Sequence, residues 1–330
     1  MDEQFRQRLE DRLEQLENRV ALLERNLALV AAGQRRASLR GLWRRPPMWT
    51  FEQYLPRLLN LNAFKSSPAI PAGAPRIAIV TPSYNHAQYI GATIDSIVNQ
   101  AYPNLHYHVQ DGASIDGTVD LLKSRGNSIS WKSEPDKGQS NAINLGFAGV
   151  DCEIMAYLNS DDMLLPGTLA HVVNYFISHP DVDIVYGNRI FIDSDGLEVG
   201  RAVLPPHDGK TLQYADYIPQ ETMFWRKRVW DKIGPIDESF HFAMDWDFIL
   251  RAQAAGFKFV RMPRFLSCFR IHDAQKTAAT YAVGVKEMGI LRRRVLGFDP
   301  TQIQIRRAIA PYLLRQVAYH YGYKLGVLRY

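Results

Sequence analysis

Residues 154–162 read IMAYLNSDD, an apolar stretch that ends in an amide and two carboxylates. The apolar part is typical of a buried strand, and residues 163–167 are expected to start a helix. Ligands of open α/β sheets bind where the strands reach their carboxyl ends. Asp161 and Asp162 are therefore expected at such an edge, where a divalent cation would offset their repulsion. The same pattern also fits a polar turn that caps a helix.

Two further acidic positions follow the same logic. Asp111 comes directly after the apolar run 105–109 and Gln110, and Asp245 precedes a segment with an amphipathic helical pattern. Each has a plain structural alternative, because an aspartate at such a place also forms a capped loop or a helix N-cap. Three acidic sites at element ends favour a functional cluster over three separate caps.

Strands and helices alternate along most of the chain, which indicates an α/β fold with a mixed, mainly parallel sheet flanked by helices. Strands are expected at residues 76–80, 105–109, 129–132, 154–158, 182–186, 190–193 and 197–199. Helices are expected at residues 86–99, 117–122, 140–148 and 167–177.

Composition limits the classes of protein. The 330 residues, 46% of them hydrophobic, suffice for one large α/β domain with appendages. No apolar run reaches the ~18 residues of a membrane span, and the polar N-terminus is not a secretory signal, so a cytoplasmic protein is expected. Cys152 and Cys268 are expected to be reduced, buried thiols. The net charge of +5 favours anionic partners, nucleotide phosphates or a lipid surface; no nucleic-acid partner is expected.

Residues 1–33 carry an uninterrupted heptad pattern. Apolar residues alternate spacings of four and three at Leu9, Leu13, Leu16, Val20, Leu23, Leu27 and Val30. This predicts a parallel coiled coil through residues 9–30 that makes the chain a homo-oligomer, with a trimer favoured over a dimer. The alternative is a single amphipathic helix docked on the rest of the chain.

Two segments combine basic and apolar residues. Residues 34–75 form a basic, Pro-rich and aromatic linker, and residues 276–330 form a helical C-terminal region. Such segments are typical of peripheral contact with an anionic membrane surface. A solvated linker and a helix packed on the domain are the alternative.

Seven motifs in fixed order resemble family 2 glycosyltransferases of the GT-A fold, over about residues 76–273. They are TPSYN (81–85), DGASIDGT (111–118), EPDKGQSNAINLG (134–146), LNSDD (158–162), QET (220–222), DWD (245–247) and FRIH (269–272). The resemblance implies a GT-A domain at residues 76–275. It also implies a metal-dependent, inverting transfer from a nucleotide-diphosphate sugar, uridine-linked in first place, to a glycan or lipid-linked acceptor in polysaccharide biosynthesis.

The resemblance also assigns roles around the metal. Asp161 stands where the family binds Mg²⁺ or Mn²⁺, and His272 would help to bind the metal or the diphosphate. Asn159 departs from the aspartate of many members and would bind the ribose or a metal-bound water. Ser160, between Asn159 and Asp161, is assigned with Asn159 and Asp162 to the binding of the donor. Asp162 would orient a donor-sugar hydroxyl or cap the next helix.

Further residues are assigned to the nucleotide and the acceptor. Asp245 aligns with the family's general base. Asp111 looks like the aspartate that contacts the base, and Asp136 and Lys137 lie in a loop that faces the nucleotide. Thr81, Ser83 and Asn85 would border the base and ribose.

Two other functions remain open at this point. One is a GT-A-like module that binds a nucleotide sugar or glycan without catalysis, and the joint presence of Asp111, Asp161 and Asp245 argues against it. The other is a nucleotidyltransferase, which usually carries a Gly-rich basic loop after its first strand. Residues 81–86, TPSYNH, do not form such a loop.

Overall fold

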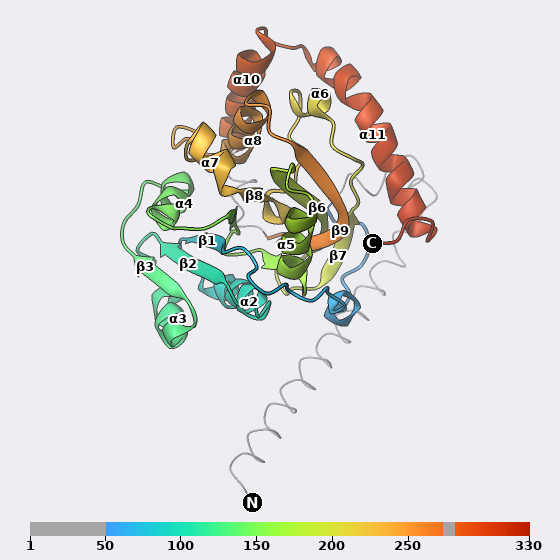
Figure 1. Ribbon diagram of the computed structural model, residues 1–330. Helices are drawn as coiled ribbons and strands as arrows, with labels where there is room; N and C mark the ends of the chain where they lie inside the picture. The colour runs from blue at the N-terminus through green and yellow to red at the C-terminus, as the bar shows by residue number, and fades with distance from the viewer. Residues whose placement is uncertain (1–50, 273–280) are drawn as a thin grey trace, which may run out of the picture.

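The computed structural model describes residues 51–272 and 281–330 (Figure 1). The predicted coiled coil and the first part of the linker, residues 34–50, lie outside this part of the chain. Within it, strands and helices alternate as predicted and build one mixed nine-stranded sheet. The α/β prediction is therefore confirmed for the described residues.

The sheet has a parallel half and a mixed half. Its order is β3-β2-β1-β4-β8-β6-β9-β5, with β7 paired to β6. The first four strands in this order run parallel, whereas β8 runs antiparallel to both β4 and β6. The strands are β1 Ile77–Ser83, β2 Leu105–Asp111, β3 Ser130–Ser133, β4 Ile154–Tyr157, β5 Met163–Leu164, β6 Ile184–Ile192, β7 Glu198–Ala202, β8 Phe224–Arg226 and β9 Phe259–Arg270.

Helices cover both faces of the sheet because the central strands are apolar on both sides. Ile77 and Ile79 of β1 belong to the core beneath α2 and α5, while Ala78 and Val80 belong to the core beneath α4 and α8. The helices are α2 Ala87–Val98, α3 Thr118–Ser124, α4 Gln139–Phe147, α5 Thr168–Ser178, α6 Gly209–Leu212, α7 Lys227–Ile233, α8 Met244–Ala254, α10 Tyr281–Leu296 and α11 Gln302–Lys324. Short 3₁₀ turns occupy Leu61–Phe64, Gly126–Ser128 and Gln220–Thr222.

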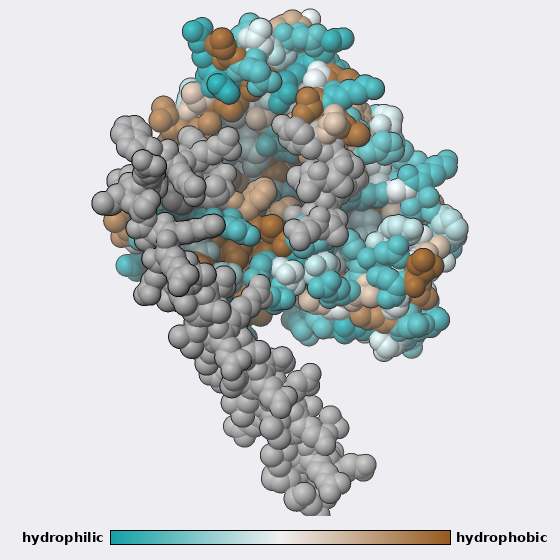
Figure 2. All heavy atoms as spheres, turned by 180° about the vertical axis from the view of Figure 1, so that it is seen from behind, coloured by the Kyte–Doolittle hydropathy of each residue, from teal (hydrophilic) through white to brown (hydrophobic). Residues whose placement is uncertain are grey.

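The C-terminal helix α11 runs along one edge of the domain (Figure 1). Ile305, Tyr312 and His320 are its buried residues, and Arg315 forms an ion pair with Asp208. This is the packed arrangement that the sequence left open as the alternative to membrane contact. On the face seen in Figure 2, hydrophilic and apolar residues are interspersed, with apolar residues both near the middle and along the outline.

One local detail differs from the sequence-based expectation. Residues 163–164 do not start a helix: they form β5, paired with β9, and α5 begins only at Thr168 after Gly167. Gly167 has a positive φ of 76°, which suits glycine and lets the chain turn from strand to helix. No helix in the described residues is long and apolar enough to cross a membrane.

Candidate active site

A cleft of about 1080 Å³ opens at the carboxyl ends of β1 and β4. One side is built by the segments that follow β1, β2 and β3, and the other by the loop before β8, by α8 and by α10. Between them lies the segment 159–162. We call these two sides the donor half and the acceptor half. The edge of the sheet that the sequence singled out is thus the floor of a cleft.

Asp161 and His272 meet at this floor although they lie 111 positions apart in the chain. Asp161 Oδ2 and His272 Nε2 are 3.0 Å apart, and the imidazole is almost fully buried. Among residues 51–272 and 281–330, no group of three His, Cys, Asp or Glu side chains is arranged to hold a metal ion. A carboxylate with a neighbouring imidazole nonetheless suits a divalent cation whose other ligands are phosphate oxygens and water.

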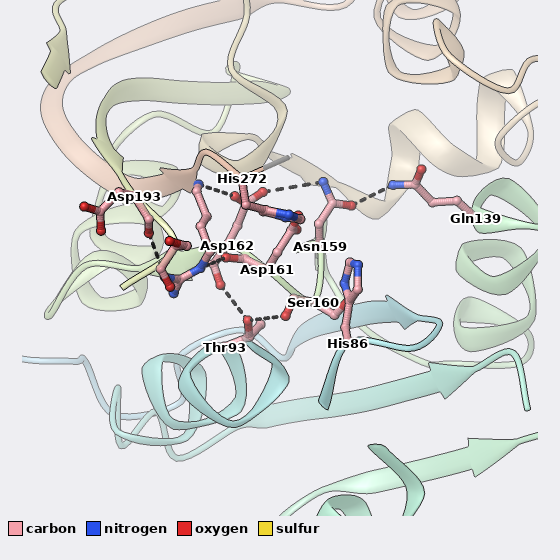
Figure 3. Close-up of polar contacts among 11 residues, drawn as sticks. His86, Thr93, Gln139, Asn159, Ser160, Asp161, Asp162, Asp193 and His272 are labelled. Atoms are coloured by element: carbon pink, nitrogen blue, oxygen red, sulfur yellow. Dashed lines mark hydrogen bonds and ion pairs between the residues drawn. The ribbon is translucent and has the colours of Figure 1, made fainter. Parts of the chain in front are cut away.

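Asp162 is held against the backbone of β9 and anchors the loop (Figure 3). Its carboxylate accepts a hydrogen bond from the backbone amide of Arg270 at 3.0 Å. The hydroxyl of Thr93 on α2 donates to the carbonyl oxygens of both Ser160 and Asp162, at 2.9 and 2.8 Å. Burial raises the pKa of Asp162 well above its usual value, and the charge of Asp161 raises it further. Asp162 therefore fixes the shape of the loop that presents Asp161.

Ser160 and Asn159 are tied to the donor half (Figure 3). The hydroxyl of Ser160 and Nδ1 of His86 are 2.6 Å apart, and burial lowers the pKa of His86. Asn159 accepts a hydrogen bond from Gln139 at 2.7 Å. His86 and Gln139 also line the cleft, and the sequence analysis did not select them. Gln139 lies inside the motif at residues 134–146 and His86 directly follows the motif at residues 81–85, so the available signal was a polar residue in or next to a motif.

The donor half contains a narrow floor formed by Gly112. A Cβ atom at this position would lie 2.9 Å from Asp136 Oδ2 and 3.3 Å from the ring of Tyr84. Asp136, Tyr84 and Ser83 all line the cleft. The buried hydroxyl of Ser83 has no hydrogen-bond partner among the described residues. A flat ring and a ribose hydroxyl would fit beside these groups.

Asp111 lies at the end of β2, as predicted, but its carboxylate is fully buried. It accepts hydrogen bonds from the Ser114 amide at 2.9 Å and from the Ser133 hydroxyl at 2.6 Å. Asp111 therefore ties the loop after β2 to the end of β3. For Asp111 to contact a nucleotide base, one of these two serines would have to give up its hydrogen bond to the carboxylate.

Three other predicted donor-site residues lie beside the cleft wall. Thr81 is fully buried, and its hydroxyl is 3.1 Å from that of Tyr107. Asn85 accepts a hydrogen bond from the Ile115 amide at 3.0 Å, and Lys137 is exposed. Asn85 has a positive φ of 53°, a conformation that asparagine tolerates better than most residues. It shapes the turn that carries Tyr84 and His86.

Asp245 lies in the first turn of α8 and lines the acceptor half. Its Oδ1 accepts a hydrogen bond from the Trp246 amide at 2.8 Å. Trp246 is 1% exposed and donates from its indole nitrogen to the carbonyl of Leu212 at 2.9 Å. The indole is thus mostly part of the core, whereas Asp245 is only partly buried where it lines the cleft.

Asp216 is a second carboxylate in the acceptor half, and the sequence analysis missed it. It lies in the loop before β8 and lines the cleft. Although the side chain is open to the solvent of the cleft, the surrounding protein raises its pKa well above the usual value, and the charge of Asp245 adds to this. Asp216 belongs to none of the seven motifs, so the sequence offered no signal for it.

The family can now be assigned from comparison with known proteins. The sequence profile described as Glycosyl transferase family 2 matches residues 78–243, half of the chain. The chain belongs to glycosyl transferase family 2. The match contains the donor half and the Asp161 segment, and it ends just before α8 and Asp245.

Individual relatives agree with this assignment. A PGL/p-HBAD biosynthesis glycosyltransferase of Mycobacterium bovis (strain BCG / Pasteur 1173P2) is 28% identical over 183 residues, which cover 54% of this chain and 70% of the relative. An uncharacterised glycosyltransferase of Mycobacterium tuberculosis (strain CDC 1551 / Oshkosh) is 30% identical over 185 residues, which cover 54% and 69%.

Solved structures share the fold. S. aureus TarS 1–349 in complex with UDP-GlcNAc superposes with a TM-score of 0.54 at 16% identity, over 76% of this chain and 75% of that one. The mannosyltransferase PcManGT from Pyrobaculum calidifontis, in complex with GDP-Man and Mn²⁺, gives 0.54 at 18% identity, over 74% and 70%. The family 2 member described here therefore has the mixed α/β, Rossmann-like GT-A fold.

Proposed function

We propose that this family 2 member transfers a sugar, with inversion, from a nucleotide-diphosphate sugar to a glycan or lipid-linked acceptor. One observation carries the proposal: a single cleft joins the Asp161–His272 pair to Asp245, with a donor half on one side and an acceptor half on the other. Family membership supports glycosyl transfer. The solved structures of TarS with UDP-GlcNAc and of PcManGT with GDP-Man support a nucleotide sugar as donor.

The donor half provides places for a nucleotide. The base would lie over Gly112 between Tyr84 and Asp136, and the unpartnered hydroxyl of Ser83 would bind the base or ribose. The diphosphate would then extend toward Asp161 and Asn159. We propose a uridine-linked donor in first place, on the resemblance of the motifs at residues 81–85 and 111–118.

Asp161 and His272 would hold Mg²⁺ or Mn²⁺ together with the diphosphate. A bound divalent ion supplies positive charge that stabilises the leaving diphosphate. The 3.0 Å separation of Asp161 Oδ2 and His272 Nε2 places both atoms at one point, where a bound cation would take the place of the proton that they share. The Thr93 and Arg270 contacts hold the loop that carries Asp161. The PcManGT complex contains Mn²⁺, which supports a divalent cation here.

Asp245 would act as the general base. Its carboxylate takes the proton of the acceptor hydroxyl while the hydroxyl oxygen bonds to the anomeric carbon. The bond from that carbon to the diphosphate oxygen breaks, and the nucleoside diphosphate leaves with the electron pair. Attack from the side opposite the leaving group inverts the anomeric configuration. A positioned base typically contributes about 10²- to 10⁴-fold to the rate.

Nucleotide binding tests the donor half and the metal together. UDP titrated into the wild-type chain should bind more tightly with Mn²⁺ than with a chelator, and Asp161→Ala should remove most of that difference. The matched control is Asp120→Ala, because Asp120 is an exposed carboxylate on α3 with only a surface ion pair. A variant Asp161→Ala with an unchanged response to the metal would refute the metal assignment.

The division of the chain into regions and its oligomeric state are also proposals, and both rest on the sequence alone. We propose four regions: a coiled coil at 1–33, a linker at 34–75, the GT-A domain at 76–275 and the helical region at 276–330. A homo-oligomer would present several active sites to one polymeric acceptor and raise its effective concentration.

We also propose that the chain makes peripheral contact with a membrane through α11. In the described residues, Leu314 is 72% exposed and Arg306 and Arg307 are exposed on the same helix. Basic residues near an anionic surface contribute roughly 1 kcal/mol each. Co-sedimentation with anionic and neutral vesicles tests the idea, and equal binding to both would end it.

A further inference from the structure

The acceptor half contains a positively charged residue on α10, beyond the residues that match the family. Arg292 lines the cleft. Its guanidinium carbon lies 5.3 Å from the centre of the Trp246 ring, and its Nε donates to the carbonyl oxygen of Tyr214 at 2.8 Å. These two contacts fix the plane of the guanidinium next to the turn that carries Asp245.

Arg292 differs from its neighbours on α10 in having no carboxylate partner. Arg293 donates from Nε to Asp299 at 2.7 Å, and Arg294 donates to the buried Asp247 at 2.5 Å. Within residues 51–272 and 281–330, the two terminal nitrogens of Arg292 have no hydrogen-bond partner. Burial lowers the pKa of Arg292, and no acidic residue of the described chain raises it.

The cost of this arrangement indicates a ligand. A cation that is partly removed from water loses some of its hydration, and an anionic partner would compensate for that loss. The guanidinium of Arg292 contacts only one backbone carbonyl, that of Tyr214, and one aromatic face, that of Trp246, among the described residues. Arg189 of β6 also lines the cleft, and its terminal nitrogen lies 3.5 Å from a carboxylate oxygen of Glu221, so this arginine has an acidic partner.

We propose that Arg292 binds an anionic group of the acceptor, a phosphate or a carboxylate. The planar guanidinium offers two parallel N–H groups, which match two oxygens of such a group. Because Arg292 and Asp245 line the same cleft, an acceptor held by Arg292 also has a hydroxyl within the space beside the base. The inference rests on the proposed function, since it names the class of acceptor for the same cleft. A lipid-linked phosphate and an acidic sugar both satisfy it.

Binding of simple glucosides to the full-length chain tests the proposal without turnover. The chain is first saturated with UDP and Mn²⁺, so that phosphate probes cannot enter the donor half. Three probes are then titrated by calorimetry at constant ionic strength: methyl glucoside, methyl glucoside 6-phosphate and methyl glucuronide. A charged probe should bind the wild-type chain roughly tenfold or more tightly than the neutral one, as one charge-assisted contact implies. The better of the two charged probes distinguishes phosphate from carboxylate.

Two variants separate Arg292 from a general effect of charge. Arg292→Gln should lose the preference for charged probes, whereas Arg293→Gln, one position along α10, should keep it. Equal binding of charged and neutral probes to the wild-type chain would overturn the proposal, and so would a preference that survives in Arg292→Gln. A wild-type chain that binds no probe more tightly than Arg292→Gln does also contradicts it. Failure of UDP to bind would instead contradict the proposed function.

Discussion

Glu287 of α10 accepts a hydrogen bond from the backbone amide of Ala243, the residue that precedes α8, at 2.8 Å. The same carboxylate accepts from the amides of His241 and Phe242, each at 2.8 Å. Ala243 offers no side-chain cap to α8, and amides at a helix start need acceptors. Glu287 therefore caps, from another helix, the turn that presents Asp245.

Glu287→Ala should lower turnover roughly ten- to hundredfold, because small displacements of a catalytic group have effects of this size. UDP affinity should stay within about twofold, because Glu287 is remote from the donor half. The turnover of Glu287→Gln should lie between those of the wild-type chain and Glu287→Ala, because the amide oxygen of glutamine can still accept a hydrogen bond. Lys286→Ala, an exposed neighbour on α10, is the control. A parallel loss of UDP affinity would show that Glu287 supports the fold rather than the position of Asp245.

Asp216→Asn should stabilise the protein more at pH 8 than at pH 5. The folded-state pKa of Asp216 is raised by the surrounding protein and by the charge of Asp245, so the folded chain holds this proton more tightly than the unfolded chain, whose aspartates titrate near pH 4. Stability is consequently lost as the pH rises from about 4 toward the folded-state pKa.

Asparagine at position 216 does not ionise, so the variant avoids this loss of stability at high pH. Thermal unfolding of both proteins at the two pH values measures it, and the gain in Tm at pH 8 should exceed that at pH 5 by roughly 2 °C or more. Equal gains at both values would mean that Asp216 does not titrate with a raised pKa.

Gly112→Ala should weaken UDP binding by about tenfold or more. The added methyl group would press on Asp136 and Tyr84, where we place the base, and overpacking of this kind typically costs about 1–3 kcal/mol. The control is Gly289→Ala in α10, where a Cβ meets nothing within 4 Å. Unchanged UDP affinity in Gly112→Ala would place the base elsewhere.

Removal of residues 1–38 should turn the proposed oligomer into a monomer. The heptad pattern from Leu9 to Val30 predicts that assembly depends on this segment. Light scattering on the full chain and on a chain that starts at Leu39 measures the mass of each. The prediction fails with a monomeric full-length chain, or with a shortened chain that keeps its oligomeric mass.

The sequence predicted the sheet and the floor of the cleft because both depend on local patterns. Apolar runs mark the strands, and polar residues at their ends mark the edge where Asp161 and Asp162 lie. His272 could be assigned only through the resemblance, because nothing local indicates that it meets Asp161. Asp111 was placed at the correct strand end, but its serine partners come from two different loops, and such contacts are invisible to strand periodicity.

The acceptor half could not be predicted in the same way. Glu287 and Arg292 lie in a helix with no motif. Their significance comes from contacts of Glu287 with the amides of residues 241–243 and of Arg292 with Tyr214 and Trp246. Asp216 lies in an irregular loop and acquires its raised pKa only in the folded chain. The roles of these residues depend on tertiary contacts alone, so no local sequence pattern could predict them.

The release of nucleoside diphosphate tests the central claim most directly. Wild-type chain and Asp245→Asn are incubated with a panel of nucleotide sugars, with Mn²⁺ or with a chelator, and free nucleoside diphosphate and pyrophosphate are both measured. We predict that the wild-type chain releases nucleoside diphosphate from at least one donor only when the metal is present. Asp245→Asn should bind UDP with nearly wild-type affinity and keep less than about a tenth of the rate. Release of pyrophosphate, or tight nucleotide binding without any release by the wild-type chain, would contradict the account.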